Sequence, residues 1–213
     1  MGLCMDDLNN KVKIFLDLVL SSSSAVALTG AGISTESGIP DYRSPGTGLW
    51  EKMDQSIVSI DGFTREPSRY YDYSLELYSA RRDAKPNIAH YMLAELEKRG
   101  FLKGIITQNV DGLHQVAGSE QVHELHGSLR QAVCLDCSAL QSMDEAMDRV
   151  ISGENPPPLC NDCGGVLKPN AVFLERCCPE CPGSALLSSL AALSSLLPPV
   201  PLCRYLLQTL SRT

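Results

Sequence analysis

Four cysteines in two close pairs are the residues of this 213-residue chain with the clearest chemistry. Cys134 and Cys137 form one C-x-x-C pair, and Cys160 and Cys163 form the other. Four thiolates presented from two tight turns suit tetrahedral zinc with no open coordination position. The spacing therefore predicts a structural zinc site, and the alternative is a set of reduced cysteines without a metal.

A glycine-rich turn offers a second kind of chemistry. An apolar run at 25–28 leads into Thr29-Gly30-Ala31-Gly32, and a polar helical start follows at 34–37. Glycines allow a ligand to approach the backbone, and a helix N-terminus presents free N–H groups to a phosphate, so this pattern is typical of a dinucleotide site. Thr35 stands where the dinucleotide fingerprint has glycine, which leaves an ordinary strand-to-helix turn as the alternative.

Polar side chains also follow a second predicted strand. A helical stretch at 88–99 precedes the apolar run 102–107, and Gln108, Asn109 and Asp111 come directly afterwards. Helix followed by strand implies a parallel sheet, and ligands bind at the carboxyl edge of such a sheet. The two amides can bond ribose hydroxyls and Asp111 can accept from a carboxamide, whereas the alternative is a capped, solvated loop.

Composition narrows the class of protein. The formal net charge of -7 argues against binding to nucleic acid or to an anionic membrane. The first ten residues lack the pattern of a secretory signal, and pairing of the cysteines indicates metal in a reducing compartment rather than disulfides. We expect an intracellular, cytoplasmic protein, with the nucleus and the mitochondrion left open. The sequence does not indicate an oligomeric state.

These elements predict an α/β fold, a Rossmann-like parallel sheet with an inserted small zinc-binding module. We expect a dinucleotide-binding domain at 1–130, the zinc-binding module at 131–168, a strand start at 169–175 and an atypical tail at 176–213. An amphipathic pattern at 8–20 also predicts a docking helix, with Leu8, Val12, Phe15, Leu16 and Val19 on one stripe.

Two motifs carry a resemblance to a known family. A stretch of fifteen residues resembles, nearly residue for residue, the cofactor loop of sirtuins, the NAD-dependent protein deacylases, and reads Gly30-Ala-Gly-Ile-Ser-Thr-Glu-Ser-Gly-Ile-Pro-Asp-Tyr-Arg-Ser44. The run Thr107-Gln-Asn-Val-Asp-Gly-Leu-His114 is similar to the sirtuin motif that lines the nicotinamide and ribose pocket. The resemblance implies these NAD-binding residues: Gly30, Ala31, Gly32, Ser34, Thr35, Ile39, Asp41, Tyr42, Arg43, Gln108, Asn109, Val110 and Asp111.

The same resemblance implies a reaction in which an acyl-lysine carbonyl oxygen attacks the ribose carbon that bears nicotinamide. His126 is then the general base that deprotonates a ribose hydroxyl, so that the acyl group passes to ADP-ribose, and Asn109 is the second catalytic residue. His123 lies three residues earlier, but no further ligand motif supports a metal site at this histidine pair. The other histidines, His90 and His114, are taken as structural.

The resemblance also covers the start of a substrate-clamping strand at 168–173, where Val172 and Phe173 are expected to contact an acyl-lysine protein or peptide. Sirtuins that prefer acidic acyl groups carry a Tyr-x-x-Arg pair, and counting places Ser74 and Leu77 at those positions. An apolar acyl such as acetyl therefore fits better. Tyr78-x-x-Arg81 has the same spelling one helical turn later and is interpreted as coincidence.

The resemblance stops after Phe173, and the strands that complete the sirtuin sheet do not follow. The tail is rich in Leu, Ser and Pro, carries no charge between Glu180 and Arg204, and is expected to be disordered rather than to span a membrane. A frameshift, a retained intron or a truncated gene model would explain the change, and Cys178-x-x-Cys181 is interpreted as incidental. The leading hypothesis is an NAD-dependent protein-lysine deacetylase, with zinc structural. Its alternatives are a catalytically impaired binding or regulatory protein and an ADP-ribosyl transferase.

Overall fold

The computed structural model divides the chain into two units, Met1–Glu175 and Arg176–Thr213, and describes residues 5–174. The expectations for the tail and for the Cys178 pair concern residues outside this range. Within residues 5–174, none of the helices combines the length and the apolarity needed to cross a bilayer.

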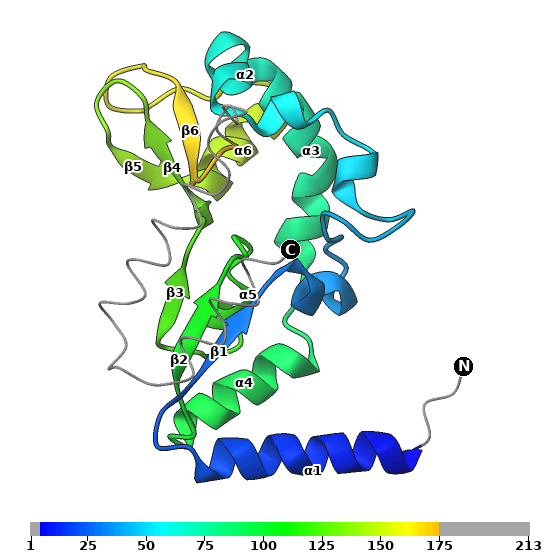
Figure 1. The fold of residues 1–213 in the computed structure, drawn as a ribbon. Coiled ribbons are helices and arrows are strands. Elements are labelled where there is room, and N and C mark those ends of the chain that lie inside the picture. The colour runs from blue at the N-terminus through cyan, green and yellow to red at the C-terminus, as the bar shows by residue number, and fades with distance from the viewer. Residues whose placement is uncertain (1–4, 175–213) are drawn as a thin grey trace, which may run out of the picture. The chain divides into compact units, whose positions relative to one another are not determined.

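The first of two sheets is parallel and has three strands, in the order β1 (Ala25–Thr29), β2 (Leu102–Thr107) and β3 (Val122–Glu124) (Figure 1). The register aligns Thr29 with Thr107, and Thr107 with Glu124. All three strands therefore end at one edge, as the predicted Rossmann-like arrangement requires. The expected strands at 25–28 and 102–107 are confirmed. Ile105 is fully buried, and Leu102 and Ile106 are nearly so.

Helix α4 (Ile88–Lys98) precedes β2 as predicted, and it begins at a capping box. The Asn87 side chain accepts from the Ala89 N–H at 2.9 Å, and the His90 side chain accepts from the Asn87 N–H at 3.3 Å. Short α5 (Leu113–Val116) follows β2 after the left-handed Gly112. The capping box of α4 satisfies backbone donors that a helix start otherwise leaves free.

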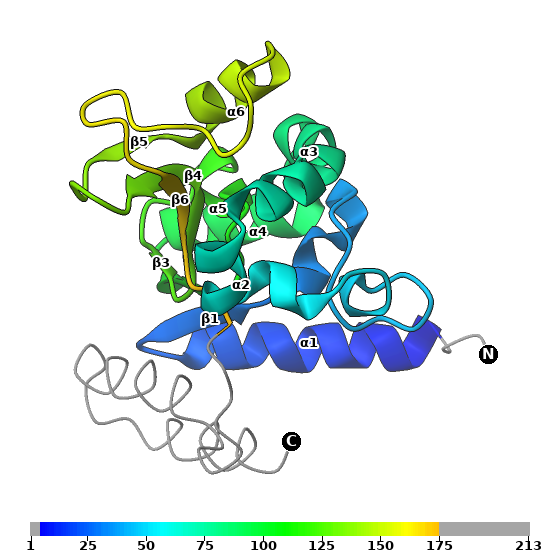
Figure 2. The ribbon, with the colours of Figure 1, turned by 90° about the horizontal axis from the view of Figure 1, so that it is seen from above.

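The second sheet is antiparallel, in the order β5 (Leu140–Ser142), β4 (Gly127–Cys134) and β6 (Leu167–Ala171), with α6 (Met143–Ile151) beside it (Figure 2). It carries the four cysteines, and so confirms the small module inserted after the parallel strands. Its buried core also takes in α2 (Ile60–Arg65) and α3 (Pro67–Asp83). The side chains of this core are Phe63, Tyr70, Tyr71, Tyr78, Ala132, Cys134, Met143, Ala146, Met147, Cys160, Leu167 and Phe173.

Aromatic contacts explain why helices so distant in sequence join this module. Phe63 is fully buried and meets Phe173 edge to face at 5.2 Å between ring centroids. The hydroxyl of buried Tyr71 donates to the Leu167 carbonyl at 2.7 Å. Residues 60–83 therefore pack with the cysteine module, although they lie within the 1–130 range expected for the NAD-binding domain.

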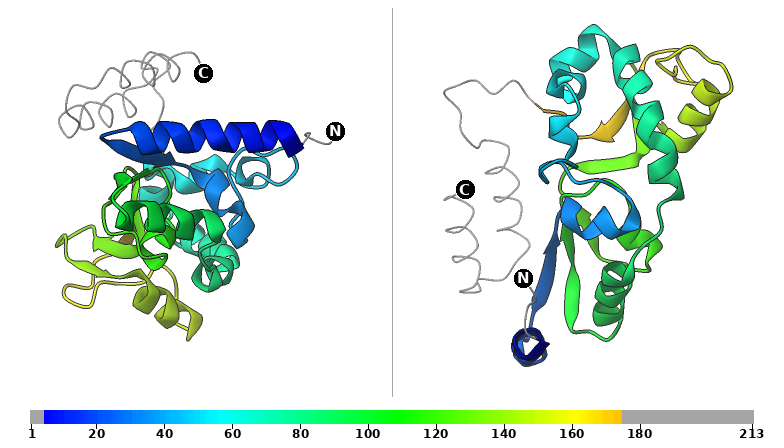
Figure 3. Two further views of the ribbon diagram at one scale, coloured as in Figure 1. Left: turned by 90° about the horizontal axis from the view of Figure 1, so that it is seen from below. Right: turned by 90° about the vertical axis from the view of Figure 1, so that its right-hand side faces the viewer.

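Helix α1 (Met5–Ser21) confirms the predicted helix at 8–20, and it is seen end-on near the start of β1 in Figure 3 (right). Of its predicted stripe, Val19 is buried, whereas Val12, Phe15 and Leu16 are 44–55% exposed. The short 3₁₀ helices η1 (Ala31–Ser37), η2 (Leu49–Glu51) and η3 (Gln55–Val58) complete the described elements.

Substitution of two phenylalanines, one buried and one exposed, tests this packing. Phe63→Ala should lower the free energy of unfolding by about 3–5 kcal/mol because it empties a fully buried site. Phe15→Ala should change it by less than about 0.5 kcal/mol because the ring is 55% exposed. Urea unfolding of both variants checks the difference, and equal losses would contradict the described core.

Candidate active site at the carboxyl edge of the sheet

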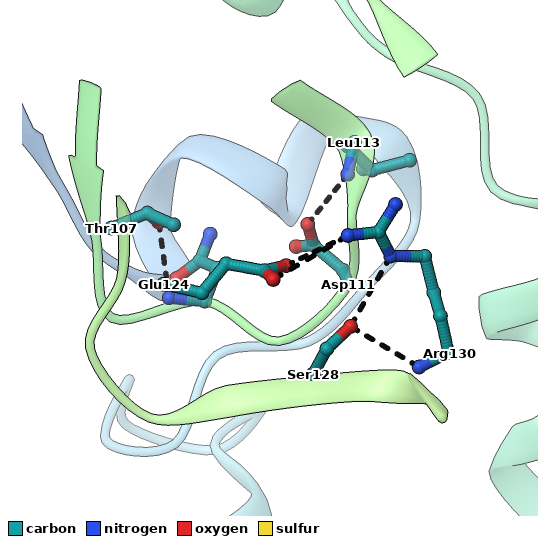
Figure 4. Close-up of polar contacts among 7 residues, drawn as sticks. Thr107, Asp111, Leu113, Glu124, Ser128 and Arg130 are labelled. Atoms are coloured by element: carbon teal, nitrogen blue, oxygen red, sulfur yellow. Dashed lines mark hydrogen bonds and ion pairs between the residues drawn. The ribbon is translucent and has the colours of Figure 1, made fainter. Parts of the chain in front are cut away.

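Three predicted NAD-binding side chains form a hydrogen-bond network where β1 and β2 end. The Ser34 hydroxyl donates to Asp111 Oδ2 at 2.7 Å, and Asn109 Nδ2 donates to Ser34 Oγ at 3.1 Å. Ser34 and Asn109 are 1% and 8% exposed. Asp111 Oδ1 also accepts from the Leu113 N–H at 2.9 Å, which fixes the carboxylate (Figure 4). The network joins the loops that follow two neighbouring strands.

The glycine turn adopts a tighter helix than the sequence predicts. Residues 31–37 form a 3₁₀ helix, which ends at Gly38 with a left-handed φ of 87°. The Gly38 N–H donates to Thr35, and the Ile39 N–H donates back to Ser34. This reversal places the Ser34 side chain inward, while Thr35 is exposed and its hydroxyl donates to the Gly32 carbonyl.

Open space lies beside the two glycines that precede this helix. A β-carbon placed on Gly30 or Gly32 would meet no atom of the described chain within 4 Å. Internal packing therefore gives no reason for glycine here, whereas a bound group lying close to the backbone does. This observation fits the phosphate-binding role expected for the turn.

The loop after Gly38 is braced by its own contacts. Asp41 accepts from the Ser44 hydroxyl at 2.6 Å and from the Ser44 N–H at 2.9 Å, and the hydroxyl bond lowers the pKa of Asp41 below its usual value. The Tyr42 ring lies 5.0 Å from the Trp50 ring and stays 41% exposed, and Arg43 is exposed beside it. Both side chains remain accessible to a ligand.

His126 lies between β3 and β4 and contacts the loop that follows β2. Its Nδ1 lies 3.0 Å from the Gln108 carbonyl oxygen, which can only accept, so Nδ1 carries the proton. Nε2 is then left with a free lone pair on an exposed ring, as a general base requires. The Gln108 side chain itself is exposed, and the Val110 carbonyl accepts from the Leu129 N–H at 3.1 Å.

Arg130 connects β4 to the same loop. Its Nε lies 3.2 Å from Ser128 Oγ, and its terminal nitrogen lies 3.4 Å from each carboxylate oxygen of Glu124 at the end of β3 (Figure 4). The arginine stem covers Gly112, where a β-carbon would lie 2.8 Å from Arg130 Cδ. The left-handed glycine thus allows the arginine to pass over the loop that carries Asp111.

The predicted metal ligands gather at one point of the small module. The Sγ atoms of Cys134, Cys137, Cys160 and Cys163 all lie within 4.8 Å of one another, with separations of 3.4 Å for Cys134–Cys163 and 3.7 Å for Cys137–Cys160. Tetrahedral zinc at about 2.3 Å from each sulfur would hold these atoms about 3.8 Å apart. The cluster therefore fits zinc.

The expected substrate residues lie at the end of β6 and have different surroundings. Val172 is 63% exposed, and its N–H donates to the His126 carbonyl at 2.9 Å. Phe173 is 9% exposed because its ring packs on Phe63 and Tyr70. Only Val172 offers its side chain freely to a peptide, and β6 ends two residues before Phe173.

Helix α3 carries the residues that bear on the choice of acyl group. Ser74 is 5% exposed, and Leu77 is partly buried. The Tyr78 hydroxyl donates to Asp144 at 2.9 Å, which engages the first residue of the Tyr-x-x-Arg spelling within the protein. This contact agrees with the interpretation of that spelling as coincidence.

Residues that sequence reasoning left out lie directly behind the network. The Thr29 hydroxyl donates to the Thr107 hydroxyl at 2.8 Å, and the Asn109 N–H donates to the same Thr107 oxygen at 3.1 Å. His114 Nε2 lies 2.9 Å from the Thr29 hydroxyl. The position of each threonine as the last residue of a strand was a signal for this role.

The fold and site define an α/β protein with a network of polar side chains at the carboxyl edge of a Rossmann-like sheet and a four-cysteine module beside it. The Sir2 family profile matches residues 30–183, so the chain belongs to the Sir2 family. This finding confirms the sirtuin resemblance of the two loop motifs.

Individual relatives and solved structures agree. The chain is 47% identical over 168 residues to NAD-dependent protein deacetylase 2 of Caldanaerobacter subterraneus subsp. tengcongensis, covering 78% of this chain and 67% of that protein. It is 47% identical over 157 residues to an NAD-dependent protein deacetylase of Sulfurisphaera tokodaii, covering 74% and 62%. A structure described as Sir2, p53 peptide and NAD⁺ matches with a TM-score of 0.69 at 40% identity, covering 84% and 70%. The chain thus spans about two thirds of the length of these relatives.

Gly127, the residue after His126, provides a test of how the site is held. Its φ is 72°, and a β-carbon there would collide with the Asn170 carbonyl oxygen of β6. Gly127→Ala should lower the free energy of unfolding by at least about 2 kcal/mol. Gly118→Ala is the matched control, because φ is 101° but the space is open, so about 1 kcal/mol is expected. Equal losses in urea unfolding would contradict the close approach of β4 and β6.

Proposed function

We propose that the chain is an NAD-dependent protein-lysine deacetylase that transfers the acyl group to ADP-ribose and releases nicotinamide. One observation carries the proposal: the Ser34, Asn109 and Asp111 network lies at the carboxyl edge, beside a histidine whose Nε2 is free. Membership of the Sir2 family and relatives named as deacetylases support it. A family fold without these side chains would support only nucleotide binding.

The proposed roles follow from the chemistry of each side chain. Asn109 and Asp111 are held by Ser34 in one orientation, which suits recognition of a ribose hydroxyl and of the nicotinamide carboxamide. His126 takes a proton from a ribose hydroxyl through Nε2, while the Gln108 carbonyl keeps Nδ1 protonated. Residues 30–32 leave room for the phosphates, and Tyr42 and Arg43 cover the site and exclude water.

Zinc at the four cysteines is proposed as a structural ion that joins the two C-x-x-C turns of the small module. All four coordination positions are then filled by sulfur, so the ion has no place for a reactant. Cys134 ends β4, whereas the turn at 160–163 lies close before β6. Through these strands the metal would also steady His126 and Val172, since β4 begins at the residue after His126.

The proposed substrate is a peptide or protein with an acetylated lysine. Val172 is exposed at the end of β6, where an extended peptide can pair its backbone with the chain. The Ser74 and Leu77 side chains offer no cation to an acidic acyl group, in keeping with an apolar acyl. A related structure is described as Sir2Tm bound to a propionylated peptide, whose acyl group is apolar.

The direct test is nicotinamide release from NAD in the presence of an acetyl-lysine peptide. His126→Ala should lower the steady-state rate of nicotinamide release at least about 100-fold, because each complete turnover needs the general base, while NAD still binds. His123→Ala is the matched control, because this neighbouring histidine is exposed and outside the network, and it should keep the wild-type rate. Background release from wild type and from His126→Ala alike would reject the enzyme and favour a binding protein.

The zinc assignment is tested by metal content. The full chain should hold about one zinc per molecule, and Cys160→Ser should lose most of it because one of four thiolates is missing. Cys178→Ser is the control, because Cys178 is not proposed as a ligand and its loss should leave the zinc content unchanged. Plasma emission analysis after dialysis measures both, and equal zinc in the wild type and Cys160→Ser would contradict the site.

A further inference from the structure

Two fully enclosed histidines lie behind the active-site network, and no step of the proposed reaction uses them. His90 is 0% exposed and His114 is 1% exposed, with ring centroids 4.9 Å apart and planes inclined at 56°. Each ring leaves one nitrogen without a hydrogen-bond partner, Nε2 of His90 and Nδ1 of His114. Buried polar atoms of this kind call for an explanation, because desolvation without a partner is costly.

The hydrogen bonds on the far side of each ring fix the tautomers. His90 Nδ1 accepts from the Asn87 N–H at 3.3 Å, so the proton of the neutral ring lies on Nε2. With the Thr29 hydroxyl donating to Thr107, Thr29 accepts from Nε2–H of His114. His114 Nδ1 is then a bare acceptor. The two atoms without partners are therefore one donor and one acceptor, on neighbouring rings.

We propose that His90 and His114 act as a neutral pair of positioning residues, which orders Asn109 through a relay of hydrogen bonds and one ring-to-ring contact, from the start of α4 to the ends of β1 and β2. The His90 ring packs against the His114 ring at 4.9 Å between centroids, and His114 Nε2–H donates to Thr29. Thr29 donates to Thr107, whose oxygen also accepts from the Asn109 N–H. The relay sets the backbone from which the Asn109 amide reaches Ser34.

The same pair connects the second loop of the site. Asn87, whose N–H donates to His90, also donates through Nδ2 to the Ile33 carbonyl at 2.7 Å and to Ser37 Oγ at 3.0 Å. One end of the relay therefore holds η1, and the other end holds the loop that carries Asn109. The assignment of Asn109 to NAD rests on the proposed function, whereas the relay itself rests only on these contacts.

Charge on either ring would break the relay. A proton on His114 Nδ1 would put a positive charge on a buried ring that has no hydrogen-bond partner at that nitrogen and lies 4.9 Å from the His90 ring. Burial lowers the pKa of both histidines, and the neighbouring His90 lowers that of His114 further. The negative charge of Asp111 raises the pKa of both rings and that of Glu97 raises the pKa of His114, but neither reverses the effect of burial. Both rings are therefore neutral near pH 7.

The lowered pKa values give the pH dependence a definite sign. Below the ordinary histidine value of about 6.5, the unfolded chain binds more protons than the folded chain, so the free energy of unfolding falls as the pH falls. His114→Gln keeps a donor toward Thr29 but cannot titrate. Its unfolding should take up fewer protons between pH 6.5 and 5, by up to about one per molecule, measured from the pH dependence of urea unfolding. An unchanged proton uptake would contradict a buried neutral His114.

The closing experiment reads the relay without using activity. In the ¹⁵N-labelled full chain at pH 7, NMR should show both rings neutral with the proton on Nε2. Thr29→Val removes the central hydroxyl, and should make the Asn109 amide proton exchange about five to ten times faster. Thr64→Val is the matched control, because its hydroxyl bonds only the Ile60 carbonyl of its own helix.

A charged ring, a proton on Nδ1 of His114, or equal Asn109 exchange in Thr29→Val and Thr64→Val would overturn the proposal. Nicotinamide release is recorded on the same samples. An inactive wild type would reject the proposed function, and the tautomers and the exchange rates would still decide whether the relay exists.

Discussion

The contact between the Thr29 and Thr107 hydroxyls is the point on which the site depends. The two hydroxyl oxygens lie 2.8 Å apart and join the last residues of two parallel strands, which the strand register puts side by side. The loops that leave the strands then start from fixed places, which lets Ser34 reach both Asp111 and Asn109. Since Ser34 is nearly fully enclosed, its hydroxyl needs these partners, and the two loops hold each other in place.

The small module extends this arrangement rather than standing apart from it. Strand β4 begins directly after His126, and Arg130 on the same strand covers Gly112 and contacts Glu124. The His126 carbonyl accepts from Val172, so the proposed base and the proposed peptide-binding segment share a hydrogen bond. Aromatic packing of Phe63 on Phe173 anchors that segment from the other side. A change in the module should therefore reach the site through β4 and β6.

Local patterns in the sequence predicted the strands at 25–28 and 102–107, the helices at 8–20 and 88–99, and the closeness of the four cysteines, because each pattern reflects one element or one short spacing. The structure differs where distant residues decide. The 3₁₀ form of residues 31–37 follows the inward bonds of Ser34, and α2 and α3 join the cysteine module through rings that meet only in the folded chain. The contact from Thr29 to Thr107 spans 78 residues, so its discovery needs the strand register. For the same reason, the sequence predicts His90 and His114 only as structural histidines and does not indicate their partners.

The most direct test of the account is to identify the product formed from NAD and an acetyl-lysine peptide by mass spectrometry. Acyl transfer by His126 at this edge predicts acetyl-ADP-ribose, formed in equal amount with nicotinamide and deacetylated peptide. Nicotinamide accompanied by ADP-ribose attached to a protein acceptor, with the peptide still acetylated, would contradict deacetylation and favour ADP-ribosyl transfer. NAD left intact by a folded, zinc-loaded chain would contradict the enzymatic account as a whole.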